Sequence, residues 1–328
     1  MRGFLIEETG DTFRAGVSDV APGPLDPDDV GVDVEFSGVN YKDAMVARAK
    51  SRVRRVARLV GGVDAAGVVA SSTNPALPVG ARVAVHGGGL GVSRDGGFCG
   101  VVYAPAHLVN LLPDSVSTRD AMVIGTAGFT AMASVLALEA HGLAPGAHVL
   151  VTGATGGVGS MAVTFLAARG YEVTASTGSS AEADWLRARG AATVIGRGDI
   201  ADHPERVLAA ERWDAAVDCV GGLTLPQILR SLRYGGAVAA SGLVAGAEVD
   251  TTVYPFIVRG VSLLGIDSVD MGVAARLRVW AALGDQRSRV NLEPLVDRVA
   301  PLEELPRALG EVFSGATRGR VLVDPAAR

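Results

Sequence analysis

Three glycines spaced three residues apart, Gly153, Gly156 and Gly159, stand between a β-branched run and a helical pattern. Residues without side chains let a pyrophosphate approach backbone N–H groups and the positive end of the following helix. The pattern predicts a dinucleotide site, with contacts from Gly153, Ala154, Gly156, Gly157, Val158 and Gly159. A sharp turn that uses glycine only for its dihedral angles is less favoured, because strand, glycines, helix and second strand follow in order.

The end of the second strand indicates which dinucleotide would bind. NAD-binding proteins usually place Asp or Glu there, to accept a hydrogen bond from the ribose 2′-hydroxyl, whereas this chain has Ser176 and Thr177. A carboxylate would repel a 2′-phosphate, small hydroxyl groups tolerate one, and the nearby Arg197 supplies positive charge. We therefore expect NADPH, with Ser179 also at the site. The alternative is that 176–180 is a solvated cap and that Arg197 points to water.

Strands and helices alternate along the chain around the glycine corner, residues 153–159. Val158, Met161, Ala162, Phe165 and Leu166 form one stripe of a helix that can pack on a sheet. Ser179 and Glu182 have capping-box spacing for a second helix, which Gly190 would end. Further strands are expected at Thr193–Ile195, Ala215–Cys219, Ala237–Ser241 and Val261–Ile266. The pattern predicts a doubly wound parallel sheet of six strands.

The composition limits the class of protein. A chain of 328 residues predicts two domains, and a formal charge of −5 gives no general attraction to nucleic acid. The two cysteines form no disulfide framework, which suits the reducing cytoplasm. Glu7 and Glu8 stand where a signal peptide would need its apolar run, so none is expected. The uncharged stretches Ala121–Leu138 and Val149–Ala168 are broken by glycine, serine and threonine, so no membrane span is expected.

The first 120 residues lack helical periodicity and predict a small β-barrel-like domain. Over the whole chain the motif order resembles the medium-chain dehydrogenase/reductase superfamily. The motifs are GVNYKD, GGVDAAG, IGTAGFTAM, VTGATGGVGS, STGSSAEADWL, DCVGG, PFIVRGVSLLGIDS and GRVLVD. IGTAGFTAM and PFIVRGVSLLGIDS are similar to the branch of acrylyl-CoA reductases and quinone-oxidoreductase-like proteins.

The resemblance implies an architecture and further cofactor contacts. A GroES-like β-barrel catalytic domain would comprise residues 1–121 and 269–328, and a Rossmann NADP-binding domain would comprise 122–268. By the same resemblance, the nicotinamide and its ribose would be surrounded by Thr126, Thr130, Gly221, Gly242 and Ser268. Arg320 would reach the pyrophosphate, with a surface arginine as the nearly equal alternative.

Zinc-dependent relatives carry a cysteine and a glycine-histidine-glutamate motif in the catalytic domain. By this resemblance, the corresponding positions here are occupied by Asn40 and by Gly62, Val63 and Asp64. None of these residues offers the thiolate or imidazole that a tight zinc site needs. We therefore expect no catalytic metal. Reduction of an alkene conjugated to a carbonyl needs none, because hydrogen-bond donors can stabilise the enolate that forms.

Four consecutive residues, Asn40, Tyr41, Lys42 and Asp43, are the candidates for enolate stabilisation and proton donation. Tyr41 is the first choice, with plain packing as an equal alternative. Lys42 and Asp43 form a structural ion pair in the competing interpretation.

The cationic run after these residues would suit CoA phosphates, but a solvated face is favoured. It comprises Arg48, Lys50, Arg52, Arg54, Arg55 and Arg58. The chain departs from the branch here, since relatives typically have a proline before the glycine-isoleucine-aspartate motif. It departs again at Ser179, where an arginine or lysine is usual, and near Cys99 and Val101.

The five histidines are scattered and predict no catalytic arrangement. The leading hypothesis is an NADPH-dependent reductase of a short 2-enoyl-CoA resembling acryloyl-CoA. The alternatives are an NADPH-dependent quinone oxidoreductase and a non-catalytic NADP-binding protein. A homodimer is expected through the apolar strand VSLLGI.

Overall fold

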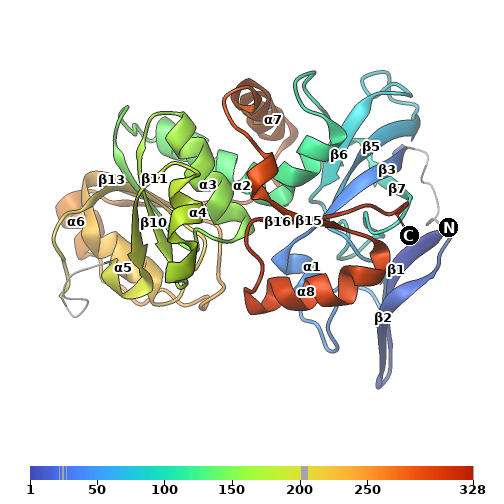
Figure 1. The fold of residues 1–328 in the computed structure, drawn as a ribbon, viewed down its shortest axis with the longest axis horizontal. Coiled ribbons are helices and arrows are strands. Elements are labelled where there is room, and N and C mark those ends of the chain that lie inside the picture. Colours follow the sequence, from blue (N-terminus) through green and yellow to red (C-terminus); the bar gives the residue numbers. More distant parts are fainter. Residues whose placement is uncertain (22, 24–25, 27, 201–205, 328) are drawn as a thin grey trace. The chain divides into compact units, whose positions relative to one another are not determined.

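The computed structural model describes every residue except 22, 24–25, 27, 201–205 and 328. The chain divides into two compact units (Figure 1). The barrel unit contains Met1–Ala127 and Ser268–Arg328, and the nucleotide unit contains Gly128–Asp267. The resemblance placed the two boundaries at 121/122 and 268/269, so the first boundary differs by six residues and the second by one.

The nucleotide unit is built on six parallel strands in the order β11-β10-β9-β12-β13-β14. This is the predicted Rossmann sheet. The strands are β9 (His148–Val151), β10 (Glu172–Thr177), β11 (Ala191–Gly196), β12 (Trp213–Asp218), β13 (Leu232–Ala240) and β14 (Ser262–Gly265). The helices are α3 (Gly157–Ala168), α4 (Ala183–Arg187), α5 (Thr224–Ser231) and α6 (Tyr254–Arg259). The first strand, β9, lies between β10 and β12, so the strand order reverses beside the glycine corner, where such sheets bind ligands.

The second crossover differs from the predicted capped helix. It begins as a 3₁₀ turn, Ser180–Glu182, and continues as α4. The Ser179 side chain makes no capping hydrogen bond, and its backbone N–H instead donates to Thr177 Oγ1. The predicted capping box is therefore wrong, because Ser179 is held by the strand end that precedes it. Gly190 has φ +98° and ends the helical segment as expected.

The barrel unit joins both ends of the chain. One sheet runs β15-β16-β3-β5-β6-β8, with β7 also paired to β3, and a smaller sheet runs β2-β1-β4. The strands are β1 (Arg2–Thr9), β2 (Thr12–Asp19), β3 (Asp29–Val39), β4 (Arg58–Val60), β5 (Asp64–Ser71), β6 (Arg82–His86), β7 (Val101–Pro105), β8 (Val109–Leu111), β15 (Val296–Ala300) and β16 (Arg320–Val323). Antiparallel pairing of β16 with β3 supplies the predicted C-terminal return. Its helices are α1 (Tyr41–Val46), α7 (Val273–Arg287) and α8 (Leu305–Ser314).

Helix α2 (Thr118–Ala140) is interrupted at Gly125, which has φ 51° and ψ −166°. In the described part of the chain it is the one helix long and apolar enough to cross a membrane, but 83% of its apolar window is buried inside the protein. A core helix explains this pattern. The other uncharged stretch forms β9, the glycine corner and α3.

Candidate active site

The glycine corner has the geometry of a nucleotide cradle. Gly153 has φ +57°, and Gly156 is the N-cap of α3 and donates its N–H to the Gly153 oxygen at 3.0 Å. A Cβ at Gly159 would lie 2.3 Å from the Gly153 oxygen. Side chains are therefore excluded where the turn meets the helix, and the amino end of α3 begins at Gly157. The buried Ala154 donates its N–H to the Ser176 oxygen, which ties the corner to β10.

At the end of β10, Arg197 lies beside the segment predicted to contact a 2′-phosphate, and because the residue is exposed this contact stays a prediction. Arg197 follows β11 directly, and a Cβ at Gly178 would lie 2.5 Å from its guanidinium carbon. The guanidinium therefore lies against the backbone at the strand end. Ser176 is buried and its hydroxyl donates to the Gly196 oxygen at 3.5 Å, so Ser176 is used inside the sheet. Ser179 is exposed beside them.

Two more predicted cofactor residues belong to turns after β12 and β13. Gly221 has φ +68° and donates its N–H to Asp218 Oδ2 at 3.0 Å. A Cβ at Gly242 would lie 1.9 Å from the Cys219 oxygen, so the two turns pack against each other without side chains between them. Thr130 is buried in the part of α2 that belongs to this unit.

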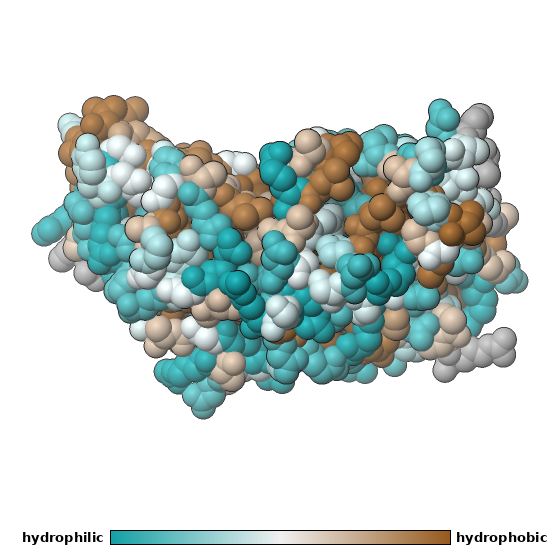
Figure 2. All heavy atoms as spheres, turned by 90° about the horizontal axis from the view of Figure 1, so that it is seen from above, coloured by the Kyte–Doolittle hydropathy of each residue, from teal (hydrophilic) through white to brown (hydrophobic). Residues whose placement is uncertain are grey.

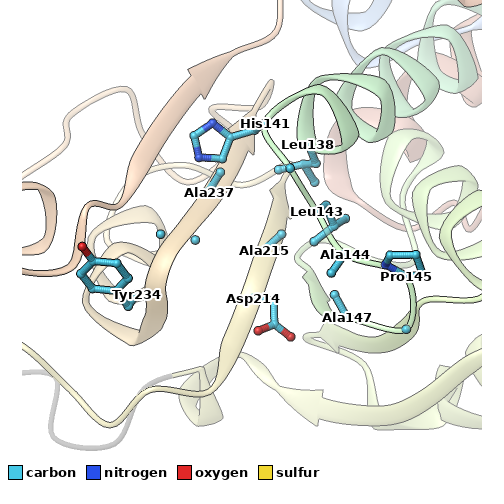
Figure 3. A pocket seen from close by; sticks show the side chains of 14 residues that line it. Leu138, His141, Leu143, Ala144, Pro145, Ala147, Asp214, Ala215, Tyr234 and Ala237 are labelled. Carbon is cyan, nitrogen blue, oxygen red and sulfur yellow. The ribbon is translucent and has the colours of Figure 1, made fainter.

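A cavity of the nucleotide unit, about 280 Å³, lies at the edge of the sheet opposite to the glycine corner (Figure 3). It is lined by the 141–147 loop and by the beginnings of β12 and β13, including Asp214 and Tyr234. The glycine corner follows the carboxyl end of β9, whereas this cavity lies where β12 and β13 begin. The cavity is therefore separate from the expected cofactor site.

A cavity of about 280 Å³ in the barrel unit brings several predicted site residues together. Asn40, Lys42, Thr126 and Ser268 all line it. Lys42 shares the cationic part with Arg52 and Arg55. The remaining lining residues are mostly apolar or glycine: Val53, Val63, Gly87, Gly89, Leu90, Val92 and Val269. Positive and apolar surfaces therefore meet in one site.

The Asn40 amide is already occupied. Its Nδ2 donates to Asp64 Oδ2 at 2.8 Å and to the Gly38 oxygen at 3.3 Å, and its Oδ1 accepts from Arg320 at 3.0 Å. Asp64 is fully buried and accepts from the Thr126 backbone and hydroxyl at 2.9 and 2.5 Å. Asn40 thus orders a polar network behind the cavity and has no unused amide N–H to offer a substrate.

Arg320 belongs to this network. It is 2% exposed, donates to the Val39 and Val123 oxygens, and has Nη2 3.6 Å from Asp64 Oδ2. Burial lowers the pKa of Arg320, which the negative charge of Asp64 opposes. The surface alternative is wrong, because the guanidinium is enclosed. Its contact with a pyrophosphate stays a prediction.

Tyr41 is placed by packing. Its ring stacks on Phe313 of α8 with centroids 5.4 Å apart and planes 4° from parallel, and the Arg48 guanidinium lies 4.1 Å from the Phe313 centroid. Tyr41 is absent from the described lining of the cavity, whereas Lys42 is present. The structure favours the packing alternative for Tyr41.

Asp43 uses both carboxylate oxygens. They accept from the Asn40 and Val63 N–H groups, each at 2.8 Å. The ion pairs found among the described residues do not include Lys42 with Asp43. The side chain of Asp43 therefore connects two backbone segments.

Four of the six residues of the cationic run fall into two groups. Arg54 is largely buried, pairs with Glu8 and donates to the Val46 oxygen, while Arg58 pairs with Glu7 at 3.8 Å. Arg52 and Arg55 are exposed and line the cavity. Their exposure agrees with the favoured solvated-face interpretation, and contact with CoA phosphates stays a prediction.

The described residues contain no group of three His, Cys, Asp or Glu side chains that could hold a metal ion. His86 is buried and accepts from Trp280 Nε1 at 3.2 Å, so it is a hydrogen-bonded core residue. Burial lowers the pKa of His86 well below its usual value. Cys99 and Cys219 are free thiols.

Comparison with known proteins identifies the family. Residues 26–114 match the alcohol dehydrogenase GroES-like domain, and residues 157–279 match the zinc-binding dehydrogenase family. The acrylyl-CoA reductase AcuI of Ruegeria pomeroyi is 42% identical over 319 residues, which cover 97% of this chain and 96% of that protein. YhfP of Bacillus subtilis, named as a quinone oxidoreductase, is 45% identical over 318 residues, with 97% and 96% covered.

Solved structures agree with this assignment. The yhdH oxidoreductase from Salmonella enterica, in complex with NADP, has a TM-score of 0.93 and 36% identity, with 99% of both chains covered. Bacillus subtilis yhfP with NAD bound has a TM-score of 0.93 and 44% identity, with 98% of both chains covered. This chain is therefore an oxidoreductase of the medium-chain dehydrogenase/reductase superfamily, in its zinc-independent branch of acrylyl-CoA reductases and quinone oxidoreductases.

Proposed function

We propose that the protein uses NADPH to reduce the activated C=C bond of a short 2-enoyl-CoA resembling acryloyl-CoA. The observation that supports this substrate is that one cavity is lined both by Lys42, Arg52 and Arg55 and by apolar side chains. CoA would offer its phosphates to Arg52 and Arg55, and its small acyl thioester to Lys42 and to the valines and leucine. The similarity to AcuI supports the same substrate class.

The cofactor assignment rests on the nucleotide unit. The corner that excludes side chains at Gly159 suits a pyrophosphate, and Arg197 at the end of β10 suits a 2′-phosphate. NADPH, when bound, would supply the hydride for the β-carbon of the substrate. NADP in the yhdH structure supports this choice, while NAD in yhfP makes direct comparison of the two cofactors the appropriate test.

The residues of the barrel unit would manage the negative charge. As charge develops on the thioester oxygen, Lys42 Nζ–H would donate to it and the Lys42 ammonium would stabilise the enolate. The same Nζ is the proposed proton source for the α-carbon. Asn40 would support this site indirectly, because Asp64, Gly38 and Arg320 already occupy its amide.

Two thioesters with the same acyl group test the role of the cavity. Acryloyl-CoA carries the phosphates and acryloyl-pantetheine does not. We expect NADPH oxidation with acryloyl-CoA and a KM at least about tenfold higher with acryloyl-pantetheine, given the strength of charge-assisted hydrogen bonds. Arg52→Gln and Arg55→Gln should raise the KM for the CoA thioester alone.

Arg58→Gln is the matched control, because Arg58 belongs to the same cationic run but pairs with Glu7 and is outside the described lining of the cavity. Equal KM values for both thioesters would remove the proposed phosphate contact. Crotonoyl-CoA in the same assay would report the tolerance for a longer acyl group.

Quinone reduction is the second candidate function. The 45% identity to YhfP and the apolar wall of the cavity favour it. NADPH oxidation by a quinone, with no turnover of either thioester, would replace the first proposal. A protein that only binds NADP is the third candidate, and it predicts cofactor binding without turnover of any of these substrates.

A further inference from the structure

Asp43 closes the start of helix α1. Its Oδ2 accepts from the N–H of the N-cap residue, Asn40, at 2.8 Å. The side chain is 2% exposed. This contact fixes Asn40, which lines the cavity, and the first turn of α1, which carries Lys42.

The other oxygen of Asp43 reaches a different segment. Oδ1 accepts from the N–H of Val63 at 2.8 Å. Val63 follows Gly62, which has φ +102° and would place a Cβ 2.6 Å from the Phe98 nitrogen. This turn is therefore closely packed from behind, and Val63 forms part of the apolar wall of the cavity.

Helix capping alone does not require this carboxylate. A neutral asparagine would offer one acceptor oxygen and avoid burying a charge beside Asp64, with Arg320 as the nearby cation. Desolvation and Asp64 raise the pKa of Asp43 to about 7, although hydrogen bonds from Asn40 and Val63 oppose the shift. What the carboxylate provides is two acceptors directed at two segments.

We infer that Asp43 is a positioning residue, which holds the Asn40–Lys42 side of the substrate cavity at a fixed distance from its wall at Val63. The inference rests on the proposed function, because it assigns Asp43 a role in placing the enoyl group against Lys42. Asp43 itself acts through its neighbours and does not touch the substrate.

Asp43→Asn retains the size of the side chain and removes one acceptor. We expect kcat/KM for the enoyl thioester to fall at least about tenfold, because small displacements of positioned groups are costly in rate. The Kd for NADPH should be unchanged. Hydrogen exchange of the 61–64 peptide should accelerate, since one of the two N–H contacts is lost. Asp43→Glu, which keeps both acceptors, should recover part of the activity.

Asp120→Asn is the matched control. Asp120 also caps a helix through its carboxylate, which accepts from Ser117 N–H at 3.2 Å, but it is outside the described lining of the cavity. Its kcat/KM should match the wild type. A full rate for Asp43→Asn, or unchanged exchange of the 61–64 peptide, would overturn the inference.

Failure of the proposed function gives a different result. Wild-type protein would then leave both thioesters unreduced, while the exchange experiment would still test the Asp43 link. If Asp43→Asn does not fold, Asp43→Glu carries the test. Partial activity of Asp43→Glu, with the Val63 amide protected from hydrogen exchange, supports the inference. Wild-type activity of Asp43→Glu, with a Val63 amide that exchanges rapidly, contradicts it.

Discussion

Gly178 and Arg197 fit together as backbone and side chain: a Cβ at position 178 would lie 2.5 Å from both the guanidinium carbon and Nε of Arg197. The absence of a side chain at Gly178 therefore makes room for the arginine at the end of β10. A glycine in one strand end thus decides where a cation from the next strand lies.

This relationship predicts cofactor selectivity. Arg197→Gln should raise the KM for NADPH by about tenfold to a hundredfold and leave the KM for NADH nearly unchanged, because the guanidinium would contact the 2′-phosphate alone. Gly178→Ala should act in the same direction by displacing the guanidinium. Steady-state kinetics with both cofactors measures this. Arg187→Gln, which breaks an exposed pair with Asp184, is the control and should change neither KM.

Lys42 and Tyr41 should separate catalysis from packing. Lys42→Met should lower kcat by about a hundredfold or more, the usual range for loss of an acid–base group, with cofactor affinity retained. Tyr41→Phe should keep its stacking on Phe313 and a near wild-type kcat. Single-turnover NADPH oxidation distinguishes the two. A large loss in Tyr41→Phe would return the proton-donor role to the tyrosine.

The buried Asp43 should make stability depend on pH. Its folded-state pKa is raised to about 7, so the folded protein binds this proton more tightly than the unfolded chain does. The contribution of Asp43 to stability is therefore largest in acid and decreases as the pH rises from about 4 to about 7. Urea unfolding should show Asp43→Asn gaining stability relative to wild type across this window. A constant difference would mean that the carboxyl titrates normally.

The nucleotide unit has the apolar surface expected of a dimer. Exposed hydrophobic residues include Val253, Tyr254, Ile257 and Val258 on and beside α6, and Leu263 on the edge strand β14. Figure 2 shows apolar atoms gathered at the end of this unit that carries α6. We predict a homodimer through this surface. Ile257→Glu should yield monomers in light scattering at micromolar concentration, while Val79→Glu, exposed on the barrel unit, should not.

The sequence predicted the nucleotide unit well because its signals are local. The glycine corner, the helix stripe and the β-branched runs each depend on neighbouring residues. The missed capping box shows the limit, since Thr177 of the preceding strand, rather than Glu182, determines how Ser179 is held.

The barrel cavity was harder to predict because its residues converge from distant segments. Nothing near Arg55 indicates that it would share a cavity with Ser268. The enclosure of Arg320 likewise depends on Asp64 and Asn40, which are far away in sequence. Residue types suggested the candidates, and tertiary packing decided among them.

The pairing of β16 with β3 also constrains biosynthesis. Arg320 donates to the carbonyl oxygen of Val39, 281 positions earlier in the chain. Until the ribosome has made β16, β3 lacks this neighbour, whereas all six strands of the Rossmann sheet have already been translated. The Rossmann unit can therefore fold first on the nascent chain, and the barrel can close only after β16 has been translated.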